Sequence, residues 1–426
     1  MSTLALLGGS PCVRGPLPPF RTIGDRERVL VNEVLDGGLL SGFYGSWSPE
    51  FFGGPFIQRF EAEWSAAFGV KHSVSVNSNT TGLLAAAGAI GLSPGDEVIV
   101  PPYTMSATAI APLFYGGIPV FVDIEADTFC LDPAKVEEAI GPRTKAIFAT
   151  NLFGHPAQLA ELRKLADRHH LFLVEDNAQG PFAEENGCYA GTIGHIGVFS
   201  LNVHKHIQAG EGGVCTTDDD VLAMKMRAIR NHGENVVTAA GLSDIVNTIG
   251  LNLRMSELTA AVGIAQLEKG RDIVADRIVI AEQLSKAVAG LPGLRAPIVR
   301  SQCRHVYYVW PLLVSPADLG ISRSTFVKAL FAEGVPVMEG YVAPLYRLPA
   351  FRHRLGIGRD GFPFALTNRR YDDVVCPIVE RMHEDTLIAY EICGFSPASA
   401  QLQQMGDAFS KVITNLGALQ TFERAA

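Results

Sequence analysis

Basic runs, CxxC pairs and long apolar runs are missing from this chain of 426 residues. Without a Lys/Arg cluster, and with a net charge of −9, it lacks the footprint of nucleic-acid binding. Its seven scattered cysteines form neither a disulfide framework nor a zinc pattern. No apolar run reaches the ~18 residues of a membrane span, and the first residues lack the basic region of a signal peptide. We therefore expect a cytoplasmic protein that binds no nucleic acid, membrane or metal.

What the chain does have is a regular alternation of short apolar segments and helical patterns. Helical periodicity is clear at 157–170, where apolar residues recur on one face. Strands alternating with helices predict an α/β fold with a mainly parallel sheet. The segments expected to be strands are 73–76, 97–100, 118–122, 145–149, 171–176 and 198–199.

Changes of composition divide the chain into three predicted parts, in line with ~100–200 residues per domain. Residues 1–55 are rich in Pro, Gly and aromatic residues and predict an arm or lid with one helix at 25–35. Residues 56–270 predict a large cofactor-binding domain. Residues 271–426 predict a smaller C-terminal α+β domain, with strands at 305–314 and 335–338 and a helix at 324–333. A long helical pattern, 256–289, is expected to link the two domains.

One lysine, Lys205, lies in a polar turn between an apolar strand and the Gly-rich segment 210–213. A tight, Gly-flanked turn can hold the lysine amine close to the neighbouring backbone. A deprotonated lysine amine forms a Schiff base with a carbonyl compound. The alternative interpretation is a solvated surface loop with an ordinary lysine.

An acidic residue upstream favours the first interpretation. The apolar segment 171–176 ends in Asp176, 29 residues before Lys205, and ligands of α/β sheets bind outside the carboxyl ends of the strands. Pyridoxal phosphate needs a lysine at its aldehyde and an acid at its pyridinium nitrogen, so the pair suggests this cofactor. The alternative for Asp176 is a helix N-cap.

A third signal is a cluster of small polar residues at 77–81, between a predicted strand and an Ala-rich helix. Asn79 and Thr80 lie in this cluster. The free N–H groups and positive dipole of a helix start bind phosphate. Plain N-capping is the alternative, and the two roles can coexist.

Three segments carry a family resemblance: VEDNAQ (174–179), FSLNVHKHIQAGEGG (199–213) and IGLNLRMSEL (249–258). From about Leu39 to the C-terminal region, the chain resembles the DegT/StrS-type sugar aminotransferases, pyridoxal-phosphate enzymes of fold type I. The resemblance implies a homodimer with shared active sites. It also implies amino transfer from glutamate or glutamine to a keto-sugar or keto-cyclitol, in amino-sugar, aminoglycoside or other secondary-metabolite biosynthesis.

The resemblance also assigns roles to single residues. It implies that Lys205 and Asp176 are catalytic, that Gln179 lies near the 3-hydroxyl oxygen of the cofactor, and that Ser200 binds the cofactor phosphate. Asn252 is expected to reach that phosphate across the dimer interface. Further candidates are Phe43 and Tyr44 on the substrate side, and Arg254 as an interface or anion-binding residue.

Two positions depart from the family pattern. Asn79 stands where the family usually has Gly, a mild departure because Asn tolerates unusual backbone angles. Met105 stands where an aromatic ring usually stacks on the pyridine ring. A thioether can pack on an aromatic face, so either Met105 replaces the ring or Tyr103 swings in. The histidines beside the lysine, His204 and His206, are each expected to point away from the site; the alternative is that one of them contacts the substrate.

The sequence argues against three rival functions. Dehydratases that the resemblance also covers carry His in place of the lysine, so Lys205 argues against dehydration. A non-catalytic regulatory protein on the same scaffold would not need Lys205, Asp176 and Ser200 together. An NAD enzyme would fit the sheet, but no GxGxxG follows a strand. The sequence leaves open which ketone is aminated, and whether glutamate or glutamine is the donor.

Overall fold

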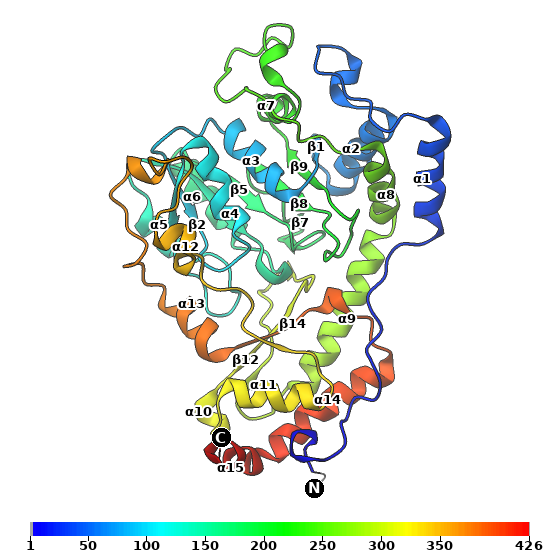
Figure 1. The fold of residues 1–426 in the computed structure, drawn as a ribbon, viewed down its shortest axis with the longest axis vertical. Coiled ribbons are helices and arrows are strands. Elements are labelled where there is room, and N and C mark those ends of the chain that lie inside the picture. Colours follow the sequence, from blue (N-terminus) through cyan, green and yellow to red (C-terminus); the bar gives the residue numbers. More distant parts are fainter. Residues whose placement is uncertain (1–2, 426) are drawn as a thin grey trace.

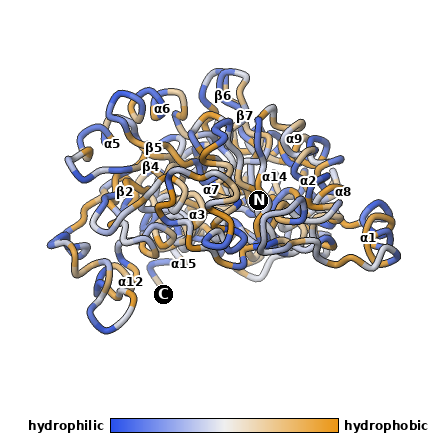
Figure 2. Tube along the Cα trace, turned by 90° about the horizontal axis from the view of Figure 1, so that it is seen from above, coloured by the Kyte–Doolittle hydropathy of each residue, from blue (hydrophilic) through white to orange (hydrophobic). Residues whose placement is uncertain are grey.

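The computed structural model describes residues 3–425. Figure 1 shows a large sheet flanked by helices in one half of the molecule and a smaller sheet with its own helices in the other. Figure 2 shows that apolar segments concentrate toward the middle of the molecule and that many hydrophilic loops lie at its rim. No helix in the described part of the chain is long and apolar enough to cross a membrane.

The large sheet has seven strands in the order β1-β9-β8-β5-β4-β2-β3. All neighbouring pairs from β8 to β3 are parallel, whereas β9 is antiparallel to both β1 and β8. The sheet confirms the predicted α/β fold with a mainly parallel arrangement; the antiparallel strand β9 was not predicted. The strands are β1 His72–Val76, β2 Glu97–Val100, β3 Ile118–Phe121, β4 Thr144–Thr150, β5 Phe172–Asp176, β8 Ile196–Ser200 and β9 Gly213–Thr217.

The helices of this half follow from local signals in the sequence. Helix α5 (Pro133–Ala139) begins where Asp132 accepts a hydrogen bond from the N–H of Ala134, with Pro at its first position. Helix α6 (Leu159–Arg168), predicted at 157–170, buries its apolar face against β4 and β5. Helices α3 (Asn79–Ala89) and α7 (Asp220–Arg230) pack on each other and on β9. Helix α1 (Asp25–Gly37) confirms the helix predicted in the N-terminal arm.

The predicted long helix at 256–289 is wrong in one respect, because the structure has two helices there. Helix α8 (Glu257–Glu268) ends before Lys269, whose backbone angles are not helical, and α9 (Gly270–Val288) begins directly after it. A Cβ at Gly270 would lie 2.7 Å from the ring of Phe182, so the second helix starts in close contact with a buried aromatic side chain. Figure 1 shows α9 passing from the large half to the small half.

The smaller half contains an antiparallel sheet in the order β10-β12-β14-β13, formed by Leu294–Arg295, Trp310–Val314, Leu387–Tyr390 and Met338–Glu339. Helices α11 (Arg323–Ala332) and α14 (Ser399–Thr414) pack on each other, and α11 confirms the predicted helix at 324–333. Two strand predictions were too long. Residues 305–309 are not part of β12, because Val306 and Tyr308 donate backbone hydrogen bonds to Gly154 and Phe153 of the large half. Residues 335–337 precede the short β13.

Buried apolar residues form two clusters, one under each sheet. The smaller cluster includes Leu4 and Val13 from the N-terminal arm. The buried carboxylate of Glu333 holds this arm by accepting hydrogen bonds from the N–H groups of Ala5 and Cys12, and it also pairs with Lys411. The arm around Ala5 and Cys12 is thereby fixed to the C-terminal half, and Figure 1 shows both ends of the chain at that end of the molecule. The domain limits near 55 and 270 stay predictions.

Candidate active site

A cavity of about 300 Å³ opens at the carboxyl ends of the parallel strands. Thr150, Asp176 and Ser200 are the last residues of β4, β5 and β8, and all three line it. This is the edge of an α/β sheet where ligands bind. The other lining residues come from the start of α3, the turn after β2, the segment around Lys205 and two tyrosines: Ser78, Asn79, Thr80, Thr104, Met105, Ala107, Ala178, Gln179, Asn202, His204, Lys205, Glu211, Tyr308 and Tyr341.

Lys205 is held in a tight turn, as predicted from its flanking residues. Its N–H donates to the carbonyl oxygen of Asn202 at 2.9 Å, and the N–H of Ala209 donates to that of Leu201 at 2.8 Å, which closes the turn. The Nζ atom lies 4.2 Å from the centre of the Tyr308 ring. Burial lowers the pKa of Lys205 to about 8, against the opposite pull of Asp176. A much larger fraction of this amine is therefore neutral at pH 7 than of an exposed lysine.

Asp176 is 3% exposed, and its carboxylate is held by neutral donors. Thr108 donates its hydroxyl to Oδ2 at 2.6 Å. The N–H of Ala178 donates to Oδ1 at 3.2 Å, and Nδ2 of Asn79 donates to the same oxygen at 3.3 Å. Burial raises the pKa of Asp176, while these hydrogen bonds and the nearby Lys205 act in the opposite direction. The acid therefore has the donors that a buried charge requires.

Helix α3 points its first residues into the cavity. Ser78 caps the helix by accepting a hydrogen bond from the N–H of Thr81 at 3.1 Å, so the predicted capping role is confirmed. The helix start lies close to β9, because a Cβ at Gly213 would be 2.7 Å from the backbone of Ser78. Any larger side chain at Gly213 would push the helix start away from the strand. Asn79 and Thr80, predicted as phosphate ligands, both line the cavity.

Gln179 belongs to a small polar network at the other end of the cavity. Its Oε1 accepts a hydrogen bond from the N–H of Phe153 at 2.7 Å, and its Nε2 donates to the hydroxyl of Tyr341 at 3.2 Å. The amide is thus fixed at both ends, with Tyr308 and Tyr341 beside it in the lining. Sequence analysis did not assign Tyr308 or Thr108 a role in the site. The aromatic segment around Tyr308 was visible as a strand pattern, but no local pattern marked Thr108.

Met105, and not Tyr103, lines the cavity. Met105 is 60% exposed, whereas Tyr103 is fully buried and accepts a hydrogen bond from the N–H of Tyr341 at 2.8 Å. This bond directs the Tyr103 hydroxyl into the protein.

The two histidines that flank Lys205 differ in their positions. His206 points away from the cavity, as expected, and lies 2.8 Å from the carbonyl oxygen of Val306 through its Nε2. His204 lines the cavity, contrary to expectation.

Asn252 lies outside the cavity of its own chain. It is exposed, and its Oδ1 accepts a hydrogen bond from Nε of Arg254 at 3.0 Å. Phe43 and Tyr44 are also absent from the lining: Phe43 is buried under the guanidinium of Arg230, and Tyr44 is 62% exposed. The structure therefore brings together seven of the eight predicted cofactor-binding residues and leaves Asn252 apart.

Comparison with known proteins identifies the fold and the family. The profile of the DegT/DnrJ/EryC1/StrS aminotransferase family matches residues 46–389. The chain belongs to this family. The family resemblance read from the sequence is thereby confirmed, and the protein is a pyridoxal-phosphate-dependent aminotransferase of fold type I.

Three similar proteins illustrate the match. The L-glutamine:2-deoxy-scyllo-inosose aminotransferase of Streptoalloteichus tenebrarius is 34% identical, covering 98% of this chain and 99% of its own length. The GDP-perosamine synthase of Caulobacter vibrioides is 36% identical, covering 70% of this chain and 80% of its own. The crystal structure of DesI with its TDP-sugar product superposes with a TM-score of 0.81 at 28% identity, covering 99% of each chain.

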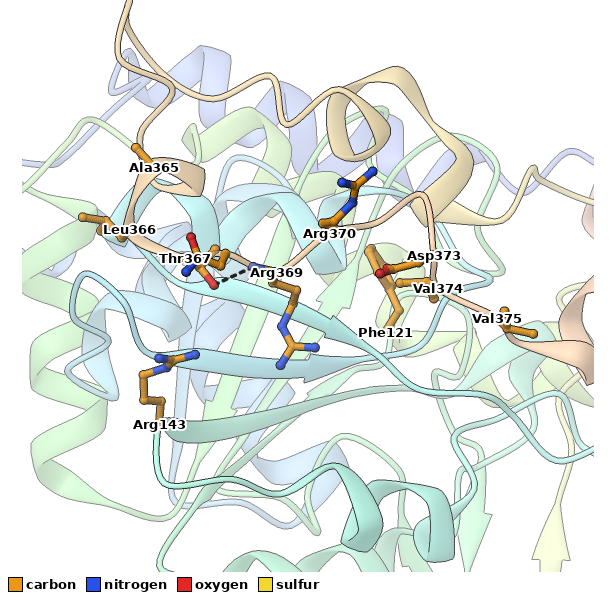
Figure 3. Close-up of a pocket in the computed structure, with 11 residues that line it drawn as sticks. Phe121, Arg143, Ala365, Leu366, Thr367, Arg369, Arg370, Asp373, Val374 and Val375 are labelled. Atoms are coloured by element: carbon orange, nitrogen blue, oxygen red, sulfur yellow. Dashed lines mark hydrogen bonds between the residues drawn. The ribbon is translucent and has the colours of Figure 1, made fainter.

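A larger cavity of this aminotransferase, about 860 Å³, is lined by Phe121 at the end of the edge strand β3, by Arg143 and by residues of the segment 365–375 (Figure 3). Arg143 precedes β4, and Arg369 comes from the segment before α13 (Pro377–Arg381). Both guanidinium groups contact the same carboxylate oxygen of Glu97, at 2.9 and 3.1 Å. Arg370, which also lines the cavity, pairs with Asp372. The charges of these three arginines therefore already have protein partners.

Proposed function

We propose that the cavity around Lys205 holds pyridoxal phosphate, and that the enzyme transfers the amino group of glutamine, or of glutamate, to a keto-cyclitol or keto-sugar. The observation that supports this most is the placement of a lysine, a buried acid and a helix start on the walls of one cavity. Each fits a different part of the cofactor: the amine its aldehyde, the acid its ring nitrogen, and the helix start its phosphate.

The cofactor supplies an aldehyde that combines with amines and a pyridine ring that withdraws electrons. In our proposal Lys205 takes a proton from the α-carbon of the amino donor and returns one in the amination of the ketone. Its lowered pKa suits this work, because a base must be neutral to accept a proton. Asp176, fixed by three hydrogen bonds, would favour a positive charge on the ring nitrogen.

The remaining residues position the cofactor and exclude water. Asn79 and Thr80, together with Ser200, would bind the phosphate through the helix start and a hydroxyl. Gln179 would donate a hydrogen bond toward the ring hydroxyl oxygen, and Met105 would lie beside the ring face. Asn252 would complete the phosphate site of a partner subunit, which explains its exposure in the single chain. The homodimer and the cytoplasmic location are part of the same proposal.

A keto-cyclitol is the first choice of acceptor. The inosose aminotransferase from Streptoalloteichus tenebrarius covers 98% of this chain at 34% identity, and two related inosose aminotransferases cover 97 and 98%. The perosamine synthase covers only 70%. Glutamine is the first choice of donor for the same reason. A dehydratase reaction is the alternative, but the lysine that can move a proton is present in this chain.

The test combines cofactor binding with a substrate screen. Purified protein with added pyridoxal phosphate should show the absorbance band of a cofactor joined to a lysine amine. The Lys205→Ala variant should lack this band. Glutamine and glutamate should then be offered with a keto-inositol, a nucleotide-linked keto-sugar and a keto-sugar phosphate. Amination of the keto-inositol with glutamine is the expected result. Amination of none of the three ketones by cofactor-loaded enzyme would refute the acceptor, and absence of the lysine-dependent absorbance would refute the site.

A further inference from the structure

The side chain of Asn79 makes a contact that its place at a phosphate-binding helix start does not require. Its Nδ2 atom lies 3.3 Å from Oδ1 of Asp176 and 3.2 Å from the carbonyl oxygen of Val198. Both neighbours are acceptors only, so the atom between them must be the amide nitrogen and not the oxygen. The orientation of the amide is therefore fixed by its surroundings, with both N–H bonds in use.

The hydrogen bonds to Asp176 divide unevenly between its two oxygens. Oδ1 accepts two, from Asn79 and from the N–H of Ala178, and Oδ2 accepts one, from the hydroxyl of Thr108. Each carboxylate oxygen has two lone-pair directions. Oδ1 is thereby saturated, and Oδ2 retains one direction for a further donor.

From this arrangement we infer that Asn79 is a positioning residue, which saturates Oδ1 of Asp176 and so reserves Oδ2 as the acceptor for the ring nitrogen of the cofactor. The inference rests on the proposed cofactor site and adds to it the means by which the acid is oriented. Asn79 acts here through its side chain, whereas a phosphate contact at the same position would use the backbone N–H of the helix start.

The hydrogen bond from Asn79 to the carbonyl oxygen of Val198 holds the amide in the position that this role requires. Val198 belongs to β8, the neighbour of the strand β5 that ends in Asp176. The amide therefore ties the start of α3 to the ends of two adjacent parallel strands. A rigid carboxylate costs less to reorganise when charge develops on the ring, which is the advantage of preorganised polar groups in active sites.

Two substitutions at this position separate the role from its alternatives. Asn79→Ala removes one donor to Oδ1 and leaves the backbone of the helix start in place. Asn79→Asp puts a second carboxylate next to Asp176, where like charges oppose each other, so it should act in the same direction with a larger effect. Thr81→Ala is the matched control: Thr81 lies outside the cavity lining, and its single hydroxyl hydrogen can be donated either to Oδ1 of Asn77 or to the carbonyl oxygen of Ser78.

The decisive measurement compares two cofactors on the apoprotein. One is pyridoxal phosphate, and the other is its analogue with CH in place of the ring nitrogen. In Asn79→Ala the dissociation constant for pyridoxal phosphate should rise about 3- to 10-fold, the scale of one typical hydrogen bond, because the lost bond acts on the ring only through Asp176, while that for the analogue should stay unchanged. The pH dependence of the bound cofactor's absorbance should shift in the same variant, and Thr81→Ala should alter both affinities equally or not at all.

Two results would overturn the inference. Equal weakening of both cofactors in Asn79→Ala would show that the side chain supports the helix start or the phosphate. Unchanged affinity and an unchanged absorbance profile would show that its bond to Asp176 has no effect on the ring. These outcomes differ from failure of the proposed function, in which wild-type protein would bind neither cofactor.

Discussion

Two cavities beside the same sheet, the one around Lys205 and the arginine cavity around Arg143 and Arg369, contrast a proposed reactive site with a structural one. Arg143 lies just before the first residue of β4 and Thr150 is its last residue, so the length of the strand places these two residues roughly 20 Å apart. The arginine cavity is the larger, at about 860 Å³ against about 300 Å³. Volume alone would thus select the wrong one.

The difference lies in the state of the charges. In the arginine cavity, burial alone would raise the pKa of Glu97, but hydrogen bonds from Arg143 and Arg369 hold it below its ordinary value. In the smaller cavity, burial lowers the pKa of Lys205 and raises that of Asp176, so each is driven toward its neutral form. Charged groups shifted by burial in a cavity are typical of catalytic sites, whereas satisfied ion pairs are typical of structural ones.

The sharpest test of this comparison is Lys205→Ala. Loss of the amine should remove the lysine-dependent cofactor absorbance and lower kcat/KM for transamination by on the order of 10³-fold, the scale of a lost proton-transfer group. Spectra and steady-state rates of the purified variant measure both effects. Circular dichroism serves as the control for folding, since the fold should be retained. Activity within tenfold of wild type would contradict the assignment of Lys205.

Asp176→Asn should have the next largest effect. The amide keeps the shape of the carboxylate but loses the charge that holds a proton on the ring nitrogen, so kcat should fall by on the order of 10²-fold. The matched control is Glu175→Gln on the same strand. Glu175 accepts hydrogen bonds from the N–H groups of Gly191, Ile193 and Gly194, so its substitution should lower the melting temperature and leave the pH dependence of the cofactor absorbance intact. If Glu175→Gln changed the pH dependence of the cofactor absorbance and Asp176→Asn only lowered the melting temperature, the roles assigned to these two acids would be the wrong way round.

Much of the site was predictable because its main residues follow strand ends in the sequence. Asp176 ends an apolar strand and Lys205 follows another, so the alternation of strands and helices was enough to place both at one edge of the sheet. The residues that orient them were not predictable in this way. Thr108 lies in the short helix α4 (Ala107–Ile110), 68 positions before Asp176 in the sequence. Only folding brings the two side chains into contact.

The wrong strand predictions have a similar physical origin. Residues 305–309 are aromatic and β-branched, as in a strand, but their backbone hydrogen bonds go to the turn around Phe153 and not to the small sheet. This crossing places Tyr308 beneath Lys205. Local patterns report which residues can form a strand, and tertiary partners decide whether they do. The break between α8 and α9 likewise lies at a tertiary contact, between Gly270 and Phe182, which is distant in sequence.

The rate at which the cofactor attaches to the apoprotein should depend on pH through the protonation state of Lys205. Only the neutral amine attacks an aldehyde, so the observed rate should rise about tenfold per pH unit below 8 and level off above that value, following the pKa of about 8. Stopped-flow absorbance of apoprotein mixed with pyridoxal phosphate between pH 6 and 9.5 measures this. A free lysine derivative is the reference, and its rate should continue to rise through the whole range. If the rate with the protein also kept rising up to pH 9.5, burial would not lower the pKa of the Lys205 amine.

The smallest effect is expected in the arginine cavity, and it tests the comparison from the other side. Arg143→Ala removes one of two partners of Glu97, but the Arg143 side chain is 61% exposed and Arg369 remains 3.1 Å from the same oxygen. Exposed ion pairs contribute about 0–1 kcal/mol, so the free energy of unfolding should fall by less than about 1 kcal/mol. Transamination and cofactor absorbance should stay as in wild type, because Arg143 lies at the opposite end of β4 from Thr150, which lines the proposed cofactor cavity. Denaturant unfolding and steady-state kinetics of the same preparation measure both quantities. A severalfold loss of kcat in this variant would mean that the two cavities are coupled, and that paired charges do not mark a purely structural cavity.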